Sequence, residues 1–160
     1  MHDTGYVGNP ADVCVYAGVA EALGRLKARG FLTVIVTNQS GIARGHFTDA
    51  DFHAVQARFL ELVGPGLIDA TYYCADHPET ATERRKPGPG MLLDAARDHG
   101  IDLAQSWMVG DRNGDVEAGR RAGVRSILVR TGEGKYADGA GAALVAADLA
   151  EAVEFILAQG

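Results

Sequence analysis

Apolar, β-branched runs alternate along this chain with amphipathic stretches of helical spacing. Continuous apolar runs are typical of parallel strands buried on both faces, and they occupy residues 31–36, 68–74, 107–109 and 126–129. Apolar side chains spaced three or four positions apart predict helices over 20–27, 91–99, 114–122 and 149–157. Strands that alternate with helices predict an α/β fold with a doubly wound parallel sheet.

Residues that cap helices support this division. Gly30 and Gly100 follow two of the predicted helices at the position where glycine commonly ends a helix. Thr48 is a plausible N-cap, and a helical stripe follows it at Phe52, Val55, Phe59, Leu62 and Val63. Loops are predicted over 75–90, which is rich in proline, glycine and charge, and over 132–141.

Composition narrows the class of protein. The 160 residues are 47% hydrophobic, which fits one domain spanning residues 1–160. The net charge of −6 argues against a nucleic-acid or anionic-membrane partner. Only Cys14 and Cys74 are present, and no apolar run approaches the roughly 20 residues of a membrane span. We therefore expect a cytoplasmic protein. We also expect it to be a monomer.

Three polar segments lie at predicted strand ends or in a loop that can return to that edge. Ligands of open α/β sheets bind at the carboxyl ends of the strands, so these segments are candidates for one site. The segments are Thr37-Asn38-Gln39-Ser40-Gly41, Arg85-Lys86-Pro87 and Gly110-Asp111-Arg112-Asn113-Gly114-Asp115.

The first segment supplies hydroxyls and amides after a buried strand. Thr37 and the backbone N–H groups around it can hold phosphate oxygens. An ordinary polar turn, with Gly41 in a left-handed conformation, explains the bare segment equally well. Arg44 and His46 downstream can add positive charge or can simply be solvated.

The other two segments supply charge. Lys86 is a compact cation suited to a phosphoryl group, and Arg85 can grip a pair of anionic oxygens, although a basic triplet in a loop is often plain surface charge. Asp111 directly follows a strand and can reach a hard cation such as Mg²⁺. Asp115 can cap the next helix, join the outer shell of the metal, or fix Lys86. Both aspartates could instead serve only as N-terminal helix carboxylates.

In this order the segments resemble the haloacid dehalogenase (HAD) superfamily of phosphotransferases. More narrowly, the chain is similar to the heptose 1,7-bisphosphate phosphatases and the histidinol-phosphate phosphatases. The resemblance covers nearly the whole chain, and its most specific parts are the runs from Thr37 to Gly45 and from Arg85 to Met91.

The resemblance implies a role for each matching residue. Thr37 and Asn38 would contact the transferred phosphoryl group, Lys86 would stabilise its charge, and Asp111 would ligate Mg²⁺. The substrate side would be lined by Gly5, Tyr6, Val7, Gln39, Ser40, Arg85 and Arg112.

Two departures from the family pattern matter. The family carries a strand ending in Asp-x-Asp-Gly, whose first aspartate attacks phosphorus and whose second is the general acid–base, and this motif is absent from the printed sequence. By resemblance that strand is central in the sheet, between the strands that end near Val36 and Val109. Its loss would leave backbone groups unpaired at about 1–3 kcal/mol each where they are buried. Our hypothesis is that Met1 is an internal methionine of a longer protein.

The second departure concerns zinc. Of the cysteine and histidine pairs that hold zinc in some relatives only Cys74 remains, so we expect no zinc. Cys14 is expected to be a small buried hydrophobe or an edge residue.

These inferences lead to one functional expectation with two alternatives. The leading one is Mg²⁺-dependent hydrolysis of a sugar phosphate, most of all the 7-phosphate of D-glycero-D-manno-heptose 1,7-bisphosphate, through an aspartyl-phosphate. The alternatives are a histidinol-phosphate phosphatase and an inactive fragment that binds phosphorylated sugars. Because the nucleophile is missing, we expect the chain as written to show negligible activity.

Overall fold

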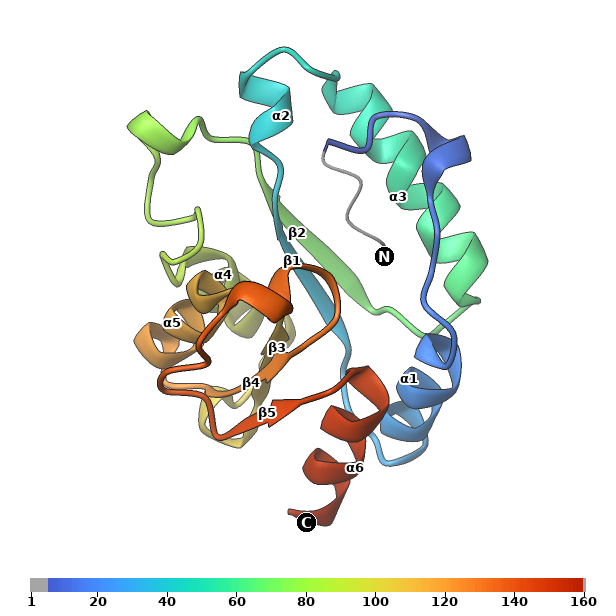
Figure 1. Ribbon diagram of the computed structural model, residues 1–160, viewed down its shortest axis with the longest axis vertical. Helices are drawn as coiled ribbons and strands as arrows, with labels where there is room; N and C mark the ends of the chain where they lie inside the picture. The colour runs from blue at the N-terminus through green and yellow to red at the C-terminus, as the bar shows by residue number, and fades with distance from the viewer. Residues whose placement is uncertain (1–5, 160) are drawn as a thin grey trace. The chain divides into compact units, whose positions relative to one another are not determined.

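The computed structural model describes residues 6–159, and the chain divides into two compact units, residues 1–80 and 81–160 (Figure 1). Gly5, one of the predicted substrate residues, lies outside the described residues. No helix within 6–159 is both long enough and apolar enough to span a bilayer.

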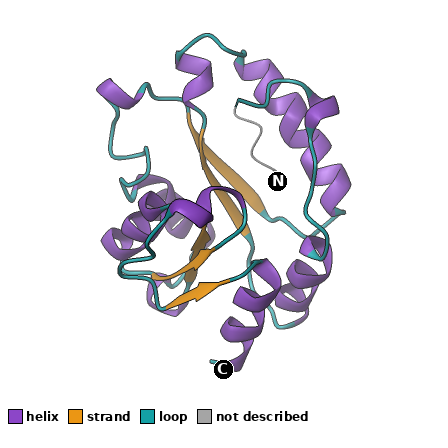
Figure 2. Ribbon diagram, in the orientation of Figure 1, coloured by secondary structure: helices purple, strands orange, loops and turns teal. Residues whose placement is uncertain are grey.

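The first unit is built around two parallel strands. Its elements are a short 3-10 helix at Pro10–Asp12, α1 (Val19–Ala28), β1 (Val34–Asn38), α2 (Ser40–Ala43), α3 (Asp49–Val63), β2 (Ala70–Cys74) and a 3-10 turn at Pro78–Thr80. β1 pairs with β2 in the register Val34 to Ala70 and Asn38 to Cys74, with α3 in the crossover between them (Figure 2).

Helix α3 begins where the sequence predicted. The side chain of Thr48 accepts a hydrogen bond from the N–H of Asp51, and the carboxylate of Asp51 accepts one from the N–H of Thr48, which forms a reciprocal capping box. Hydrogen bonds from the hydroxyl and the amide of Thr48 lower the pKa of Asp51. Phe52, Val55 and Val63 of the predicted stripe are buried, whereas Leu62 is 40% exposed.

The second unit holds a three-stranded parallel sheet in the order β3-β4-β5. Its elements are α4 (Gly90–His99), a 3-10 turn at Leu103–Gln105, β3 (Trp107–Gly110), α5 (Asn113–Ala122), β4 (Arg125–Val129), η4 (Gly132–Tyr136), β5 (Leu144–Ala146) and α6 (Leu149–Ala158). Ser126 to Val129 of the central strand β4 are all buried.

Helices α5 and α6 cover opposite faces of this sheet. Trp107 stacks edge-on against Phe155 of α6, with ring centroids 5.7 Å apart. The next residue, Met108, lies against Gly119 of α5, where an added Cβ would come within 3.1 Å of the Met108 side chain. Since successive side chains of a strand point to opposite faces, the two helices lie on opposite sides of β3.

The parallel α/β fold is thus confirmed, with three corrections at the level of elements. The first strand spans Val34–Asn38 rather than 31–36, because the N–H of Phe31 still bonds to the carbonyl of Leu26 at the end of α1. Gly41 is helical, in α2, so the alternative of a polar turn with left-handed Gly41 is wrong. The short strand β5 lies just beyond the predicted loop 132–141 and was not expected.

Among the described residues, β1 and β3 each lie at an edge of their own sheet. β1 has β2 as its neighbour and β3 has β4. The apolar sequence of both strands is typical of interior strands, yet every residue of β1 is only half-buried.

Candidate active site

The carboxyl end of β1 presents Thr37 as a hydrogen-bond donor. The side-chain amide of Gln39 donates to the Thr37 hydroxyl oxygen at 2.9 Å, and the N–H of Gln39 donates to the carbonyl of Cys74 at 2.7 Å. A hydroxyl that accepts one hydrogen bond keeps its own proton for another acceptor. Thr37 and Asn38, the last two residues of β1, therefore offer polar groups at the edge where an α/β sheet binds ligands.

The turn after β1 is held by aromatic packing. Gly41 has no room for a side chain, because a Cβ would lie 2.2 Å from the Phe47 ring and 2.8 Å from the Tyr6 ring. Tyr6 stacks on His46 with centroids 4.4 Å apart, and its side chain is half exposed. Val7 is half-buried and Ser40 is buried. The packing of these residues places Tyr6 beside the segment that follows Thr37.

In the second unit, Lys86 and Asp115 form a buried ion pair. The Lys86 ammonium lies 2.7 Å from Asp115 Oδ1, and the two side chains are 14% and 7% exposed. The second oxygen of Asp115 accepts the N–H of Arg112 at 3.0 Å, at the start of α5. Of the three roles open to Asp115, fixing Lys86 and capping the helix are therefore both realised.

Asp111 is fixed by the backbone of η4 rather than by its own helix. Its Oδ2 accepts the N–H of Glu133 at 2.9 Å. Gly132 has φ of +60°, and a Cβ there would lie 2.3 Å from the same oxygen. Asp111 is thus not the helix-capping carboxylate of the alternative interpretation, since Asp115 fills that role.

The fit of Asp111 to a magnesium ion follows from this geometry. Mg²⁺ is commonly held by one or two carboxylates, with phosphate oxygens and waters completing its octahedron. Asp111 is half-buried, and within residues 6–159 its hydrogen bond is made by Oδ2, which leaves Oδ1 without a donor from that part of the chain. No group of three or more histidine, cysteine, aspartate or glutamate side chains is gathered within residues 6–159. Asp111 therefore fits as one carboxylate ligand.

The remaining predicted cations are divided between the two units. Arg85 is half-buried beside Lys86, and the Lys86–Pro87 peptide bond is cis. Arg112 is exposed at the start of α5. In the first unit Arg44 is also exposed. In the second unit, the loop before α4 carries Arg85 and Lys86, and the segment after β3 carries Asp111 and Arg112. The first unit carries Thr37, Asn38, Gln39 and Ser40.

Cys74 is the residue that remains of the zinc-binding pairs, and His77 follows it three positions later. Cys74 is buried at the end of β2, and His77 Nδ1 accepts the N–H of Glu79 at 3.3 Å. Cys14 is exposed, contrary to the buried hydrophobe that was one of its two expected roles. The backbone at Val13 is extended, so that Val13 points inward and the next residue, Cys14, points outward.

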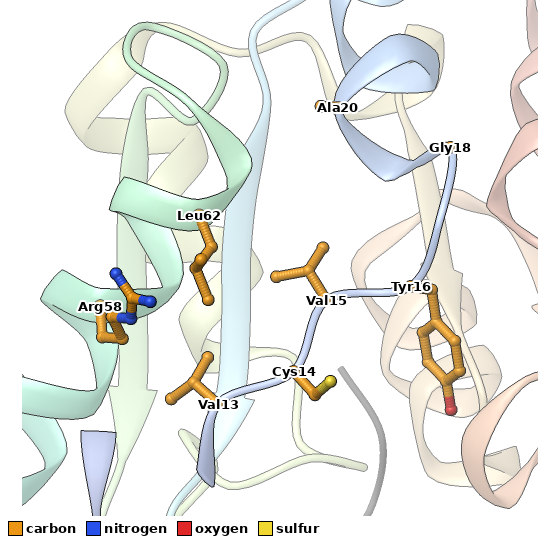
Figure 3. A pocket seen from close by; sticks show the side chains of 8 residues that line it. All are labelled: Val13, Cys14, Val15, Tyr16, Gly18, Ala20, Arg58 and Leu62. Carbon is orange, nitrogen blue, oxygen red and sulfur yellow. The ribbon is translucent and has the colours of Figure 1, made fainter. Parts of the chain in front are cut away.

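An open hollow of about 420 Å³ lies in the first unit (Figure 3). The extended segment 13–16 faces Arg58 and Leu62 of α3 across it, and Gly18 and Ala20 complete the lining. None of the predicted site residues lines this hollow.

Sequence reasoning missed the residues that fix Asp111. Glu133 donates to Asp111 through its backbone N–H, which every residue except proline carries. The side chain of Glu133 therefore does not indicate the contact. Gly132 and Gly134, two glycines just after β4, are the available signal. An added Cβ at Gly134 would lie 1.8 Å from the carbonyl of Val129, so the loop is closely packed.

Known proteins resemble the chain along most of its length. The HAD-hydrolase-like family model matches residues 83–152. The D-glycero-D-manno-heptose-1,7-bisphosphate 7-phosphatase of Thermosynechococcus vestitus is 38% identical, over 96% of this chain and 88% of that protein. The D-glycero-beta-D-manno-heptose-1,7-bisphosphate 7-phosphatase of Haemophilus ducreyi is 42% identical over 86% and 81% of the two chains.

The chain belongs to the HAD-like phosphatases. Within this family the predicted resemblance to the heptose bisphosphate phosphatases is confirmed. The D,D-heptose 1,7-bisphosphate phosphatase of B. bronchiseptica, complexed with magnesium and phosphate, matches 97% of this chain and 90% of its own, with a TM-score of 0.88 and 33% identity. The enzyme from Burkholderia thailandensis gives a TM-score of 0.71 at 27% identity, over 95% and 91%.

Proposed function

We propose that this chain serves the Mg²⁺-dependent hydrolysis of a sugar phosphate monoester, the 7-phosphate of D-glycero-D-manno-heptose 1,7-bisphosphate. The observation that carries the proposal is its similarity to 7-phosphatases of that substrate, which in the two relatives above covers 86% and 96% of the chain. The charged groups of the second unit support it, because a held lysine and a half-buried carboxylate suit a phosphoryl group and a metal ion.

The roles proposed for the residues follow from their chemistry. Thr37 and Asn38 donate hydrogen bonds to phosphoryl oxygens, and Lys86 offsets the negative charge that spreads over them. Asp111 contributes one oxygen to Mg²⁺, which when bound neutralises phosphate charge. The substrate contacts are assigned to Gly5, Tyr6, Val7, Gln39, Ser40, Arg85 and Arg112.

The nucleophile is assigned to an Asp-x-Asp-Gly strand, which the 160 residues do not contain. We therefore expect this chain to bind phosphate while hydrolysing phosphate esters negligibly. We also propose, from its cysteine content, that it is a cytoplasmic protein without zinc, and we expect it to be a monomer.

The test measures release of orthophosphate from heptose 1,7-bisphosphate and from histidinol phosphate, with and without Mg²⁺. It compares the 160-residue chain with a chain extended at its N-terminus by an apolar strand ending in Asp-x-Asp-Gly. Only the extended chain should release phosphate, and it should do so from the heptose ester in the presence of Mg²⁺.

Lys86→Ala in the extended chain should lower kcat/KM by about 10²–10³, as removal of a transition-state charge contact does. Lys135→Ala, at an exposed lysine beside Tyr136, is the matched control and should leave the rate unchanged. Faster release from histidinol phosphate would favour that alternative substrate. Release by the 160-residue chain that is abolished in Asp3→Asn would overturn the assignment of the nucleophile.

A further inference from the structure

The loop that carries Lys86 is folded tightly on itself. The N–H of Gly90 donates to the carbonyl of Glu83 at 2.9 Å, and the N–H of Gly88 donates to the carbonyl of Arg85 at 2.6 Å. A Cβ on Gly88 would lie 2.2 Å from the Glu83 carbonyl oxygen, so the two halves of the loop are in direct contact. A displacement of Glu83 or Pro87 would therefore also displace Arg85 and Lys86, which lie between them.

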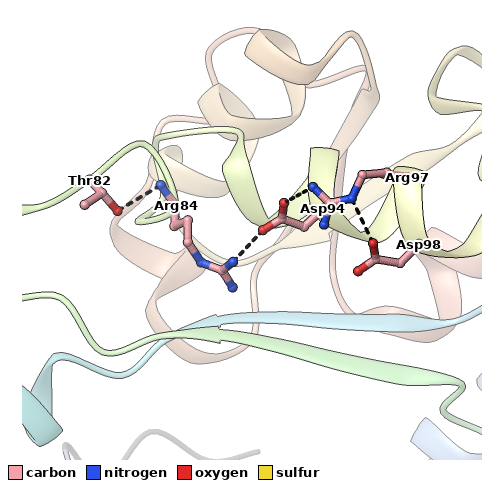
Figure 4. Close-up of polar contacts among 5 residues, drawn as sticks. All are labelled: Thr82, Arg84, Asp94, Arg97 and Asp98. Carbon is pink, nitrogen blue, oxygen red and sulfur yellow. Dashed lines mark hydrogen bonds and ion pairs between the residues drawn. The ribbon is translucent and has the colours of Figure 1, made fainter.

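Helix α4 fixes the beginning of this loop. Arg84 Nη1 lies 2.5 Å from Asp94 Oδ2, and the other oxygen of Asp94 accepts Arg97 Nη1 at 2.9 Å (Figure 4). The N–H of Arg84 also donates to the hydroxyl of Thr82 at 3.3 Å. The backbone at residues 82–84 is thus anchored on the side of α4.

Helix α5 holds the loop through Arg121, whose guanidinium bridges two points that flank Lys86. Arg121 Nη2 lies 2.6 Å from the Glu83 carboxylate, and Nη1 donates to the carbonyl of Pro87 at 3.2 Å. The same helix carries Asp115, which binds the Lys86 ammonium. One rigid element therefore fixes both the ammonium of Lys86 and the backbone next to it.

We propose that Arg121 is a positioning residue for Lys86: by joining Glu83 to the Pro87 carbonyl it sets where the Lys86 ammonium meets a bound phosphate group. The proposal rests on the proposed function for the role of Lys86 and on the contacts of the loop for the role of Arg121. The planar fork of arginine holds two acceptors in fixed geometry, which the single ammonium of a lysine does not reproduce.

The accessibility of Lys86 provides a test that needs no catalytic activity. The chain has three lysines, Lys27, Lys86 and Lys135, so acetylation by an amine-reactive ester can be followed at each by peptide mass spectrometry. Arg121→Gln should raise the labelling rate of Lys86 by about fivefold, on the order of the effect of one charge-assisted hydrogen bond on a local equilibrium. Lys27 and Lys135 serve as internal references and should not change.

The neighbouring arginine supplies a matched control. Arg120 lies in the same turn of α5 and pairs with Glu117 of its own helix, at 2.6 Å, so Arg120→Gln should leave Lys86 labelling as in the wild type. Arg121→Lys should behave like Arg121→Gln. Full recovery by lysine would contradict the bridging role, because it would show that positive charge alone is enough.

Binding of inorganic phosphate, measured by calorimetry on the same full chain, links this geometry to function. Arg121→Gln should weaken phosphate binding by about three- to tenfold, as expected when one group of a preorganised site is misplaced. Labelling of Lys86 in the urea-unfolded chain gives the rate for a fully accessible lysine. If Lys86 in Arg121→Gln is labelled at the wild-type rate on this scale, the proposal is overturned. This holds whether or not the phosphate affinity changes. Raised Lys86 labelling in Arg121→Gln, together with no phosphate binding by the wild-type chain, would instead support the positioning of Lys86 and count against the proposed function.

Discussion

At the scale of single residues, two glycines hold the acidic side chains of the second unit in place. A Cβ on Gly132 would lie 2.3 Å from Asp111 Oδ2, and a Cβ on Gly110 would lie 2.3 Å from Asp115 Oδ2. Each carboxylate therefore occupies space that any other residue would fill. The orientation of Asp111 and Asp115 therefore depends on the lack of a side chain at Gly132 and Gly110, and also on the groups that donate hydrogen bonds to the two carboxylates.

Gly132→Ala should displace the Asp111 carboxylate and weaken Mg²⁺ binding by about tenfold, since its hydrogen bond from the Glu133 N–H cannot persist beside a methyl group. The positive φ of Gly132 adds a cost of about 1–2 kcal/mol to the folded state for any residue with a Cβ. Titration calorimetry with MgCl₂ and urea unfolding measure the two effects separately.

Gly141→Ala is the control for that experiment. Gly141 also has a positive φ, of 85°, but a Cβ there would meet only Val116 Cγ1 at an ordinary 3.8 Å. This variant should lose stability and keep its Mg²⁺ affinity. Equal loss of Mg²⁺ affinity in both variants would show that strain in the segment, rather than contact with Asp111, controls the metal.

The pair between Lys86 and Asp115 was among the roles predicted for Asp115, and the contact of Asp111 with Glu133 was not. Both charges of the pair are visible in the sequence, and each needs a partner once it is buried. Glu133 lies 22 residues beyond Asp111 and uses only its backbone N–H. A hydrogen bond from a backbone N–H does not depend on the type of residue that carries it, so the identity of Glu133 does not predict this contact.

At the scale of elements, Asp69 ties helix α1 to the start of β1. Its carboxylate lies 2.7 Å from the Lys27 ammonium and accepts the N–H of Thr33, a buried residue, at 2.7 Å. The N–H of Asp69 itself donates to the carbonyl of Thr33 at 2.8 Å, just before β2 begins. One side chain thus connects three elements of the first unit.

Asp69 should give the first unit a stability that depends on acid. Burial by itself raises the pKa of Asp69, but the hydrogen bonds from Lys27 and Thr33 outweigh burial and hold the pKa below its ordinary value. A carboxyl with a lowered pKa in the folded state contributes stability that is present above its unfolded-state pKa. That contribution is lost as the pH falls through the folded-state pKa.

Asp69→Asn should therefore lower the free energy of unfolding at pH 7 by about 1–3 kcal/mol and flatten its decline in acid. Urea unfolding between pH 2.5 and 7 provides the measurement. Asp12→Asn, at an exposed aspartate of the same unit, should follow the wild type at every pH. A parallel acid decline in wild type and Asp69→Asn would rule out this carboxyl as the acid-sensitive group.

Long periodic elements were predictable and short ones were not. Helices α4, α5 and α6 begin within one residue of their predicted starts, because apolar spacing marks them, and Gly100 ends α4 as predicted. α2 has four residues and β5 has three, too few to show a period. The start of β1 moved because hydrogen bonds to Leu26 and Asp69 hold residues 31–33 outside the strand, although their side chains continue its apolar run.

At the scale of the whole molecule, the prediction of a single domain can be tested with one probe in each compact unit. Trp107, the only tryptophan, lies in the second unit between Phe155 and the guanidinium of Arg125, which stands 3.9 Å from its ring centroid. Cys74 is buried at the end of β2 in the first unit. Unfolding of either unit changes the environment of its own probe.

We predict that both probes report the same urea midpoint. The first unit contains only the two-stranded sheet β1-β2 among its described residues, and two strands alone are marginally stable in water. Such a unit should not survive unfolding of the rest of the domain, and unfolding should be one cooperative transition. Trp107 fluorescence follows the second unit, and pulse labelling of the Cys74 thiol in a Cys14→Ser variant follows the first.

The order of events distinguishes one domain from two. Exposure of Cys74 at a lower urea concentration than the change at Trp107 would mean that the first unit opens on its own, and would contradict a single domain. Cys14→Ser should not itself alter the Trp107 midpoint, because Cys14 is exposed and lies in the other unit. If the midpoints coincide, the edge strand β1 unfolds only together with the rest of the chain. Its stability then depends on the whole folded domain and not on its pairing with β2 alone.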